Sequence, residues 1–486
     1  MKKTVVLYPG LAVSHFAPMV QLADALLDEG YAVAVAIIDP TVNGDITLAA
    51  VVDRIAASKP AVTFHKLPLI QDYSPAIVHD AKFIVRYFDL VRRYNQHLHD
   101  LLLSMPMPPG SNVHALIVDM MSVEALGVAN ELGIPGYTFF PSNASALAAT
   151  VQLPSIRCAE GQPALRALGD TPLSFHGVPP VPASHLTAEM LEGPGSETYE
   201  ALMGMFARIQ ESRGILANTF GSLEARAVGA LGDPRISPKM PPLYCVGPLV
   251  AGYSGEAKKE KPHECITWLD GQPEQSVVFL CFGGTGAGIH SEEQLKEMAI
   301  GLDKSGHRFL WVVRAPAPDD PEKPFDPRAN PDLDALLPKG FLERTSGRGL
   351  VVKLWVPQVE VLNHKAVGAF VTHCGWNSVL EGISAGVPML CWPMYAEQRM
   401  NKVFMVEEYG VGVEVIGWQQ GMVKAEEIEA KVKLVMEGEQ GKRLRVRVSQ
   451  HKEAAAVAWE DGGSSRSAFG QFLTDAGCLR QRPTRS

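Results

Sequence analysis

Two residues in the first third of the chain could act on a proton. His15 follows the apolar run 4–8, and Asp119 directly follows the apolar run 116–118. An imidazole with an unperturbed pKa of about 6.5 can take a proton from a hydroxyl near neutral pH, and a carboxylate behind it fixes its tautomer and stabilises its cation. The pair predicts a general base, His15, supported by Asp119. On spacing alone, both could instead be ordinary helix-capping residues.

A second group of polar residues surrounds the expected start of a helix near Trp376. The apolar run before it ends in His373. The free N–H groups and the dipole of a helix N-terminus bind anions, and a glycine there lets the backbone come close to a ligand. The group predicts a phosphate site without lysine, formed by His373, Gly375, Asn377 and Ser378.

Side chains on either side of this phosphate site suit the rest of a nucleotide sugar. Trp355 offers a flat face to a base and Gln358 an amide to its polar edges. Glu381 lies one turn deeper on the same helix and can accept ribose hydroxyls. Glu397 and Gln398, at the start of the next expected helix, suit sugar hydroxyls. Each residue alone would be a cap, a core residue or a solvated residue, but together they predict a nucleotide-sugar site.

The elements that would position these residues alternate between strand and helix. Apolar runs read as parallel strands because they have no polar face. Pro18 is expected to open the first helix, which leaves His15 in the loop before it. The expected strands are 4–8, 31–38, 114–118, 136–140, 277–282, 308–313, 368–373 and 389–392, and the expected helices include 122–132, 291–304, 377–385, 397–409, 424–437, 440–459 and 464–475.

This alternation predicts an α/β fold of two tandem Rossmann-like, doubly wound parallel-sheet domains that face each other across a cleft. Ligands in such sheets bind at the carboxyl ends of the strands. The expected boundaries are an N-terminal domain at 1–245, a linker at 246–265, a C-terminal domain at 266–455, a C-terminal helix at 456–475 that packs back on the N-terminal domain, and a flexible tail at 476–486.

Composition narrows the function further. The 486 residues are 46% hydrophobic and 20% charged, which is typical of a globular protein, and the net charge of −9 gives no general affinity for nucleic acid or an anionic membrane. The seven cysteines contain no CxxC pair, so neither a disulfide scaffold nor a zinc site is expected. We expect a cytoplasmic protein without a membrane span, a metal or stable membrane insertion; the oligomeric state is open, with a monomer favoured.

Residues 355–398 resemble the signature box of the plant secondary-product UDP-glycosyltransferases. The similarity also covers segments 277–286 and 337–344 and the N-terminal segment. The resemblance implies an inverting enzyme that needs no cofactor or metal. A UDP-sugar is then the co-substrate in the C-terminal domain, and a small lipophilic acceptor binds in the N-terminal domain. It also implies that His15 and Asp119 are the catalytic pair.

The resemblance assigns a role to each donor-site residue. Trp355 stacks on uracil, Val356 and Gln358 hold the uridine, and Glu381 takes the ribose hydroxyls. The diphosphate is held by His373, Gly375, Asn377 and Ser378, and the hexose by Trp376, Glu397 and Gln398. A glutamine at the end of the box accompanies glucose in the family, and the neutral Trp376 supplies no counter-ion for a uronate. UDP-glucose is therefore the expected donor.

Two positions depart from the family pattern. The loop after the first strand of the C-terminal domain usually reads Phe-Gly-Ser, but here Gly284 follows Gly283, so the backbone or Thr285 would have to replace the serine hydroxyl. The family often has a threonine near the hexose where this chain has Pro141, with Ser142 beside it.

The acceptor is expected to be a flavonoid or another phenolic. A phenol with a pKa of about 10 loses its proton readily in the transition state. The expected acceptor wall includes Phe16, Met120, Met121, Phe140 and Ala396, with residues of the stretches 71–90 and 180–205. Methionine and aromatic side chains suit an adaptable apolar pocket, but the same residues could equally belong to the core.

The same sequence features bear on three alternative functions. The enzyme could use another UDP-sugar or a non-phenolic acceptor. A protein that binds nucleotide sugars or metabolites without turnover is disfavoured by the His15–Asp119 pair. A nicotinamide oxidoreductase is disfavoured because no GxGxxG stands between a strand and a helix, although Asp39 would fit the acidic residue of that fold.

Overall fold

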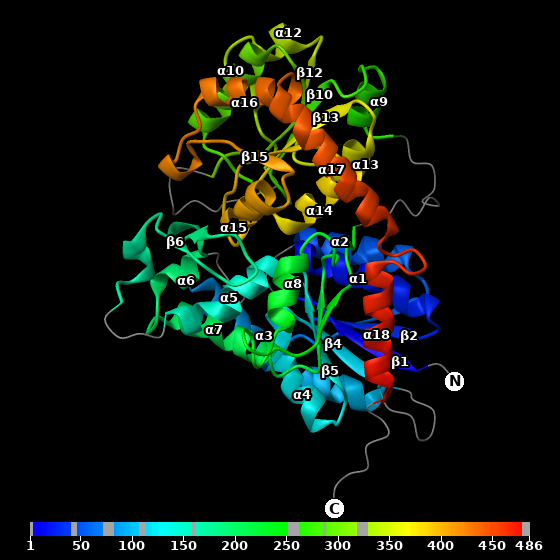
Figure 1. The fold of residues 1–486 in the computed structure, drawn as a ribbon. Helices are drawn as coiled ribbons and strands as arrows, with labels where there is room; N and C mark the ends of the chain where they lie inside the picture. The colour runs from blue at the N-terminus through cyan, green and yellow to red at the C-terminus, as the bar shows by residue number, and fades with distance from the viewer. Residues whose placement is uncertain are drawn as a thin grey trace, which may run out of the picture. The chain divides into compact units, whose positions relative to one another are not determined.

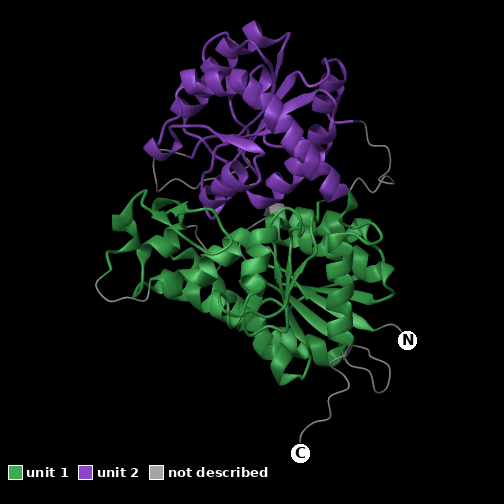
Figure 2. Cartoon of the chain, in the orientation of Figure 1, with its two compact units in different colours: residues 1–253, 457–486 green, residues 254–456 purple. Residues whose placement is uncertain are grey.

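The computed structural model describes residues 3–39, 46–70, 82–105, 113–157, 162–250, 262–284, 288–317 and 329–478. The chain forms two compact units (Figures 1 and 2): unit 1 contains residues 1–253 and 457–486, and unit 2 contains residues 254–456. Unit 2 begins inside the segment predicted as a linker, of which 251–261 lie outside the described residues. None of the helices in the described ranges has the length and apolar character of a membrane span.

Unit 1 is built on a seven-stranded parallel sheet in the order β3-β2-β1-β4-β5-β8-β9. The order reverses between β1 and β4, which pair from Val5↔Ala115 to Tyr8↔Val118. A small antiparallel pair, β6 and β7, stands apart. The strands are β1 (Thr4–Tyr8), β2 (Ala32–Ile37), β3 (Val62–Lys66), β4 (Ala115–Asp119), β5 (Gly136–Phe140), β6 (Pro172–Leu173), β7 (Val181–Pro182), β8 (Ile215–Ala217) and β9 (Leu243–Cys245).

The helices of unit 1 cover both faces of this sheet. Apolar residues of α1, α2 and α18 share one core with the strands, while α5 and α8 lie on the other side (Figure 1). The helices are α1 (Val13–Asp28), α2 (Ile46–Ser58), α3 (Phe83–Ser104), η2 (Met120–Ala125), α4 (Leu126–Glu131), α5 (Ala144–Ile156), η3 (Leu165–Leu168), η4 (Ala183–His185), α6 (Ala188–Glu192), α7 (Glu197–Ile209), α8 (Ala225–Gly232) and α18 (Ser464–Cys478).

The last helix belongs to unit 1 although it follows unit 2 in the chain. Phe472 of α18 packs edge-on against Tyr137 and Tyr244, with ring centroids 4.9 and 5.8 Å apart. Asp475 accepts a 2.6 Å hydrogen bond from the Tyr244 hydroxyl. Each buried aromatic contributes about 1.5–3 kcal/mol of hydrophobic free energy, so these contacts hold α18 on the sheet.

The first helix begins earlier than the sequence predicted. Helix α1 starts at Val13 and contains Pro18, so the expectation that Pro18 opens it is wrong. Pro18 is the sixth residue of this helix, so it removes the hydrogen bond that an N–H there would donate to the carbonyl of Ser14, and packing of the helix rather than a local signal sets where α1 begins. As a result His15 lies in the first turn of α1 and not in a loop before it. The expected helix 122–132 also divides, into the 3₁₀ turn η2 and the short α4.

Unit 2 is built on a six-stranded parallel sheet in the order β12-β11-β10-β13-β14-β15. Its order reverses between β10 and β13, as the order of unit 1 does between β1 and β4. This is the strand order of a Rossmann-like sheet. The strands are β10 (Val277–Cys281), β11 (Arg308–Val313), β12 (Gly349–Lys353), β13 (Val367–Thr372), β14 (Met389–Cys391) and β15 (Gly412–Glu414).

Local signals set the ends of the helices in unit 2. In α10, the Ser291 side chain caps the first turn, Lys304 is in the last turn, and Gly306 ends the helix with φ of 73°. The helices are α9 (Glu264–Asp270), α10 (Glu292–Ser305), α11 (Leu333–Leu336), α12 (Phe341–Thr345), α13 (Gln358–Asn363), α14 (Trp376–Ala385), α15 (Gln398–Val403), the π-helical turn η5 (Phe404–Glu408), η6 (Trp418–Gln420), α16 (Ala425–Met436) and α17 (Glu439–Val457), which ends at the unit boundary.

Candidate functional site

The predicted histidine–aspartate contact is present at the point where the strand order of unit 1 reverses. Nδ1 of His15 lies 2.9 and 3.0 Å from the two carboxylate oxygens of Asp119, the last residue of β4. Asp119 is fully buried and His15 is 22% exposed at its side chain. Because the carboxylate accepts the hydrogen bond, Nδ1 carries the proton, and Nε2 is the nitrogen that can accept one.

A close-packed shell fixes Asp119. Its Oδ1 also accepts a 2.8 Å hydrogen bond from the backbone N–H of Met121. On the other side, a β-carbon at Gly10 would lie 2.7 Å from the same oxygen, so only glycine fits there without displacing the carboxylate. Sequence reasoning found Asp119 because it directly follows a strand, but the tight fit at Gly10 exists only in the folded sheet.

Tyr87 of α3 is a member of this site that the sequence did not reveal. Its hydroxyl accepts a 2.8 Å hydrogen bond from the Leu11 N–H, in the turn that leads into α1. The same hydroxyl would lie 3.2 Å from a β-carbon at Gly10, beside Asp119. Burial, and then the charge of Asp119, raise the pKa of Tyr87 well above its usual value. Tyr87 therefore remains protonated and ties α3 to the turn before His15.

The expected acceptor residues divide into core and partly accessible positions. Phe16 is 1% exposed and belongs to the hydrophobic core of unit 1, and Phe140 is 2% exposed. Met120 and Met121 are half-buried in η2, directly after Asp119. Phe16 thus fits the core alternative, because its position on α1 faces the sheet. Ala396, in unit 2, is exposed with a φ of 52°. Residues 71–81 of the stretch 71–90 lie outside the described residues.

A buried carboxylate organises the loop after β5, where Pro141 departs from the family pattern. Glu224 accepts hydrogen bonds from the backbone N–H groups of Ala144 and Ser145, both at 2.9 Å, and from the Ser145 hydroxyl at 2.6 Å. This is a favourable place for a negative charge, because these N–H groups begin α5. Ser142 is 9% exposed, so its hydroxyl is largely inside the structure.

In unit 2, the ring of His373 lies between two glycines where the strand order reverses. A β-carbon at Gly283, after β10, would lie 2.8 Å from Nε2 of His373, and one at Gly375 would lie 2.4 Å from it. The two glycines therefore make room for the imidazole. Thr285, the residue expected to replace the family's serine, lies outside the described residues, while the adjacent Gly284 is exposed.

His373 is neutral at physiological pH. Burial, and then the charge of Arg314, lower its pKa to about 4. Its Nδ1 is buried and has no hydrogen-bond partner among the described residues. A neutral imidazole has one N–H donor, so His373 can donate to an anion at the start of α14 but brings no charge of its own. Cys374, which follows it, has an unusual φ of 65°.

Two residues expected to bind the nucleoside, Gln358 and Glu381, form one hydrogen-bonded group with Ser378, which was expected at the diphosphate. The Gln358 amide nitrogen donates to the Ser378 hydroxyl at 2.9 Å and to Oε2 of Glu381 at 2.6 Å. Burial raises the pKa of Glu381 to about 7, although the bond from Gln358 lowers it. A carboxylate in this position can accept further donors, such as a ribose diol.

The indole of Trp355 is 53% exposed, which suits a stacking surface, whereas Val356 is 3% exposed. The Trp355 ring meets the His263 ring edge-on, with centroids 5.9 Å apart. Leu354, just before it, has a φ of 69°, and its carbonyl accepts hydrogen bonds from the Arg314 side chain. Sequence reasoning missed Arg314, although the signal was the same as for Asp119: a charged residue directly after an apolar strand.

The residues expected to hold the hexose differ in accessibility. Trp376 is 3% exposed and its ring packs 6.2 Å from that of Tyr409, so a ligand would meet its backbone at the start of α14. Gln398 is also 3% exposed, and its side-chain oxygen accepts the backbone N–H groups of Met394 and Tyr395, both at 3.0 Å. Glu397 and Asn377 are half-buried at the helix starts.

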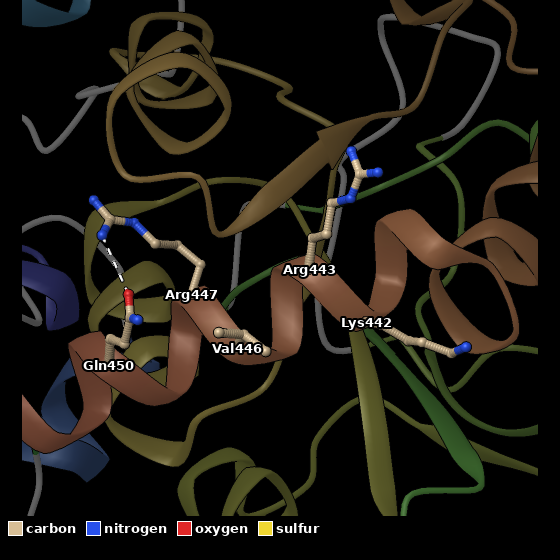
Figure 3. A pocket seen from close by; sticks show the side chains of 5 residues that line it. All are labelled: Lys442, Arg443, Val446, Arg447 and Gln450. Carbon is tan, nitrogen blue, oxygen red and sulfur yellow. Dashed lines mark hydrogen bonds between the residues drawn. The ribbon is translucent and has the colours of Figure 1, made fainter.

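A surface hollow lies on α17 (Figure 3). It measures about 360 Å³ and is lined from this one helix by Lys442, Arg443, Val446, Arg447 and Gln450. The Nε of Arg447 donates to the carbonyl of Tyr409 at 3.0 Å, just before β15 begins. Tyr409 is the C-cap residue of the turn η5, so the Arg447 cation caps a helix end. Tyr409 also precedes the start of β15, whereas His373 follows the end of β13, so Arg447 does not belong to the site around His373. No group of side chains in the described ranges could hold a metal ion.

Comparison with known proteins gives concordant matches. The family model for UDP-glucoronosyl and UDP-glucosyl transferases matches residues 241–457. An anthocyanidin 5,3-O-glucosyltransferase from a Rosa hybrid cultivar is 39% identical over 482 residues, covering 96% of this chain and 98% of the relative.

Two solved structures have the same fold over nearly the whole chain. A UDP-glucosyltransferase from Polygonum tinctorium that glucosylates indoxyl, in complex with 3,4-dichloroaniline, has a TM-score of 0.85 and 34% identity, and covers 98% of this chain and 99% of its own. The Phytolacca americana protein UGT2, complexed with UDP-2fluoro-glucose and pterostilbene, has a TM-score of 0.83 and 31% identity, with coverage of 98% and 100%.

Proposed function

This chain belongs to the plant secondary-product UDP-glycosyltransferases, and on that premise we propose that it transfers glucose from UDP-glucose, with inversion, to a hydroxyl of a small phenolic acceptor such as a flavonoid. The observation that carries the proposal is the hydrogen bond from His15 Nδ1 to the buried Asp119. It leaves Nε2 as the proton acceptor at the strand ends of unit 1, the unit that we propose binds the acceptor.

The chemistry follows from these atoms. Nε2 of His15 takes the proton of the acceptor hydroxyl, and Asp119 stabilises the imidazolium that forms. The acceptor oxygen bonds to the anomeric carbon as the bond from that carbon to the diphosphate oxygen breaks, and UDP departs with the electron pair. Attack opposite the leaving group inverts the anomeric configuration. A phenol suits this reaction because its pKa of about 10 makes proton loss easy.

We propose that unit 2 binds the donor and stabilises the leaving group. The start of α14 supplies N–H groups and its dipole to the diphosphate, and His373 supplies one neutral donor. Trp355 stacks on the base and Glu381 accepts from the ribose. The choice of glucose rests on Gln398, and the choice of a phenolic acceptor rests on what the named relatives act on. The cytoplasmic location and the monomeric state stay predictions from the sequence.

The test is a screen of the purified protein with UDP-glucose against flavonoids and simple phenols. We expect UDP release together with a product heavier by one hexosyl group. A β-linkage in this product, determined by NMR, indicates inversion. Parallel reactions with UDP-galactose and UDP-glucuronic acid test the sugar. Binding of UDP-glucose without UDP release in the presence of any acceptor would instead indicate a nucleotide-sugar-binding protein.

A further inference from the structure

We propose that Arg314 is a positioning residue of the donor site, which joins the loop after β10 to the loop after β12 and places a positive charge beside His373. The inference rests on the proposed role of unit 2 in binding the UDP-sugar. It goes beyond that role because the resemblance and the sequence assigned no cation to the diphosphate region.

The hydrogen bonds of Arg314 carry the first part of the argument. The residue directly follows Val313, the end of β11, and is 7% exposed. Its Nε and Nη2 donate to the carbonyl oxygen of Leu354 at 3.2 and 3.0 Å, and its Nη1 donates to the carbonyl oxygen of Gly284. One planar guanidinium thus spans two loops that lie at the carboxyl ends of strands on either side of β11.

The carbonyl that Arg314 holds belongs to the peptide bond before Trp355. Leu354 adopts a φ of 69°, which a residue with a branched side chain rarely adopts. Two hydrogen bonds to this carbonyl fix the peptide plane and therefore the direction in which the Trp355 side chain leaves the backbone. The indole is 53% exposed and needs such an anchor, because few atoms pack around it.

The position of the Arg314 charge carries the second part of the argument. Its Nη1 donates to the carbonyl oxygen of Gly284, and a β-carbon at the preceding Gly283 would lie 2.8 Å from Nε2 of His373. A guanidinium stays protonated in proteins, even where burial lowers its pKa as it does here. The same charge contributes to the lowered pKa of His373 and acts on Tyr395, two residues of the loops that surround the start of α14. A diphosphate at that start would therefore meet a neutral histidine and a nearby fixed cation, and the cation would favour its binding.

A half-buried arginine in unit 2, Arg445, shows what a purely structural role looks like. The Nη2 of Arg445 donates to the carbonyl oxygens of Val435 and Met436, at 3.0 and 3.1 Å, at the end of α16. Burial lowers its pKa as well. Arg445 therefore resembles Arg314 in holding backbone carbonyls, but the carbonyls belong to the end of α16 and to no residue assigned to the donor, which makes Arg445→Gln a suitable control.

The experiment measures UDP binding by calorimetry without acceptor, together with the KM values of both substrates and the melting temperature. For Arg314→Gln we expect the Kd of UDP and the KM of UDP-glucose to rise by about 10- to 100-fold, because charge-assisted hydrogen bonds are lost. The acceptor KM should change less than threefold. For Arg445→Gln we expect a lower melting temperature with an unchanged Kd.

Arg314→Lys separates the two parts of the proposal and serves if the glutamine variant does not fold. Lysine keeps the charge but cannot hold both carbonyls, so a Kd between those of wild type and Arg314→Gln supports both contributions. A wild-type Kd in Arg314→Gln, or in Arg314→Lys if that is the folded variant, would overturn the inference. Wild-type protein that fails to bind UDP would instead refute the proposed function.

Discussion

The Nε2 atom of His373 lies so close to Gly375 that a β-carbon at position 375 would stand 2.4 Å from it. Gly375 has a φ of −63°, which alanine adopts without strain, so the effect of Gly375→Ala is purely steric. We expect the imidazole to be displaced, the Kd of UDP to rise at least tenfold, and stability to fall by about 1–3 kcal/mol. Calorimetry and urea unfolding measure the two effects.

The control for this prediction is Gly347→Ala, in the exposed turn before β12. No described atom outside its chain neighbours lies within 4 Å of a β-carbon there. We expect that variant to bind UDP as the wild type does. Equal affinities for the two alanine variants would show that His373 takes no part in holding the diphosphate.

Asp119→Asn tests the catalytic pair with little change in shape. An asparagine can present its N–H to the ring, which favours the tautomer with the proton on Nε2 and removes the base. We expect kcat to fall by about 10²–10⁴-fold, as it should in His15→Ala, while both variants bind UDP normally because the proposed donor site lies in unit 2. Initial rates measure kcat, and calorimetry in parallel measures the Kd of UDP. A variant that retains full turnover would show that the substituted residue takes no part in the mechanism.

Tyr87→Phe removes the hydroxyl that accepts the Leu11 N–H at 2.8 Å. The buried donor loses its partner, which costs about 1–3 kcal/mol, and the turn before His15 loosens. We expect a severalfold lower kcat with little change in the KM of UDP-glucose.

The matched control is Tyr137→Phe. Tyr137 is equally buried, but its hydroxyl has no hydrogen-bond partner among the described residues. We expect that variant to keep its activity and its stability. Identical kinetics and melting temperatures in the two phenylalanine variants would contradict a positioning role for Tyr87.

Glu381 makes stability depend on pH above the acid range. Burial raises its pKa from 4.5 to about 7, so the folded protein holds this proton more tightly than the unfolded chain does. The associated stability is complete below about pH 4.5 and is lost as the pH rises through 7. Glu381→Gln stays neutral, and we expect it to gain up to about 3 kcal/mol relative to wild type between pH 4.5 and 8. Urea unfolding over this range measures the difference, and parallel stability curves would show that folding does not raise the pKa of Glu381.

His290 acts in the opposite direction. It packs between Phe282 and Trp392, and burial lowers its pKa from 6.5 to about 4. The stability linked to its neutral form is present above pH 6.5 and is lost as the pH falls through 4. His290→Phe cannot take up a proton, so we expect the variant to lose about 3 kcal/mol less than wild type between pH 6.5 and 4. Urea unfolding at each pH measures the stability of both proteins. An equal loss of stability in the two would show that His290 is accessible to protons in the native state.

The strands followed from the sequence because parallel strands buried on both faces are continuous apolar runs. The predicted runs 4–8, 136–140 and 308–313 coincide with β1, β5 and β11. Helix starts were less well determined. Pro18 is a start signal by local rules, but the packing of Phe16 in the core of unit 1 favours five more helical residues before it.

The sequence by itself predicted the family and most of the candidate site, because His15, Asp119 and the residues from 355 to 398 are of the right chemical type, and because Asp119 ends β4 and His373 directly follows β13. The tertiary structure alone decided which of them meet. It brought Tyr87 to Leu11, Arg314 to Leu354 and Gly284, and Gln358 to Glu381. These contacts join segments that are separated in the chain, and no local pattern encodes them. They arise because parallel strands place their carboxyl ends, and the residues that follow, at one edge of a sheet.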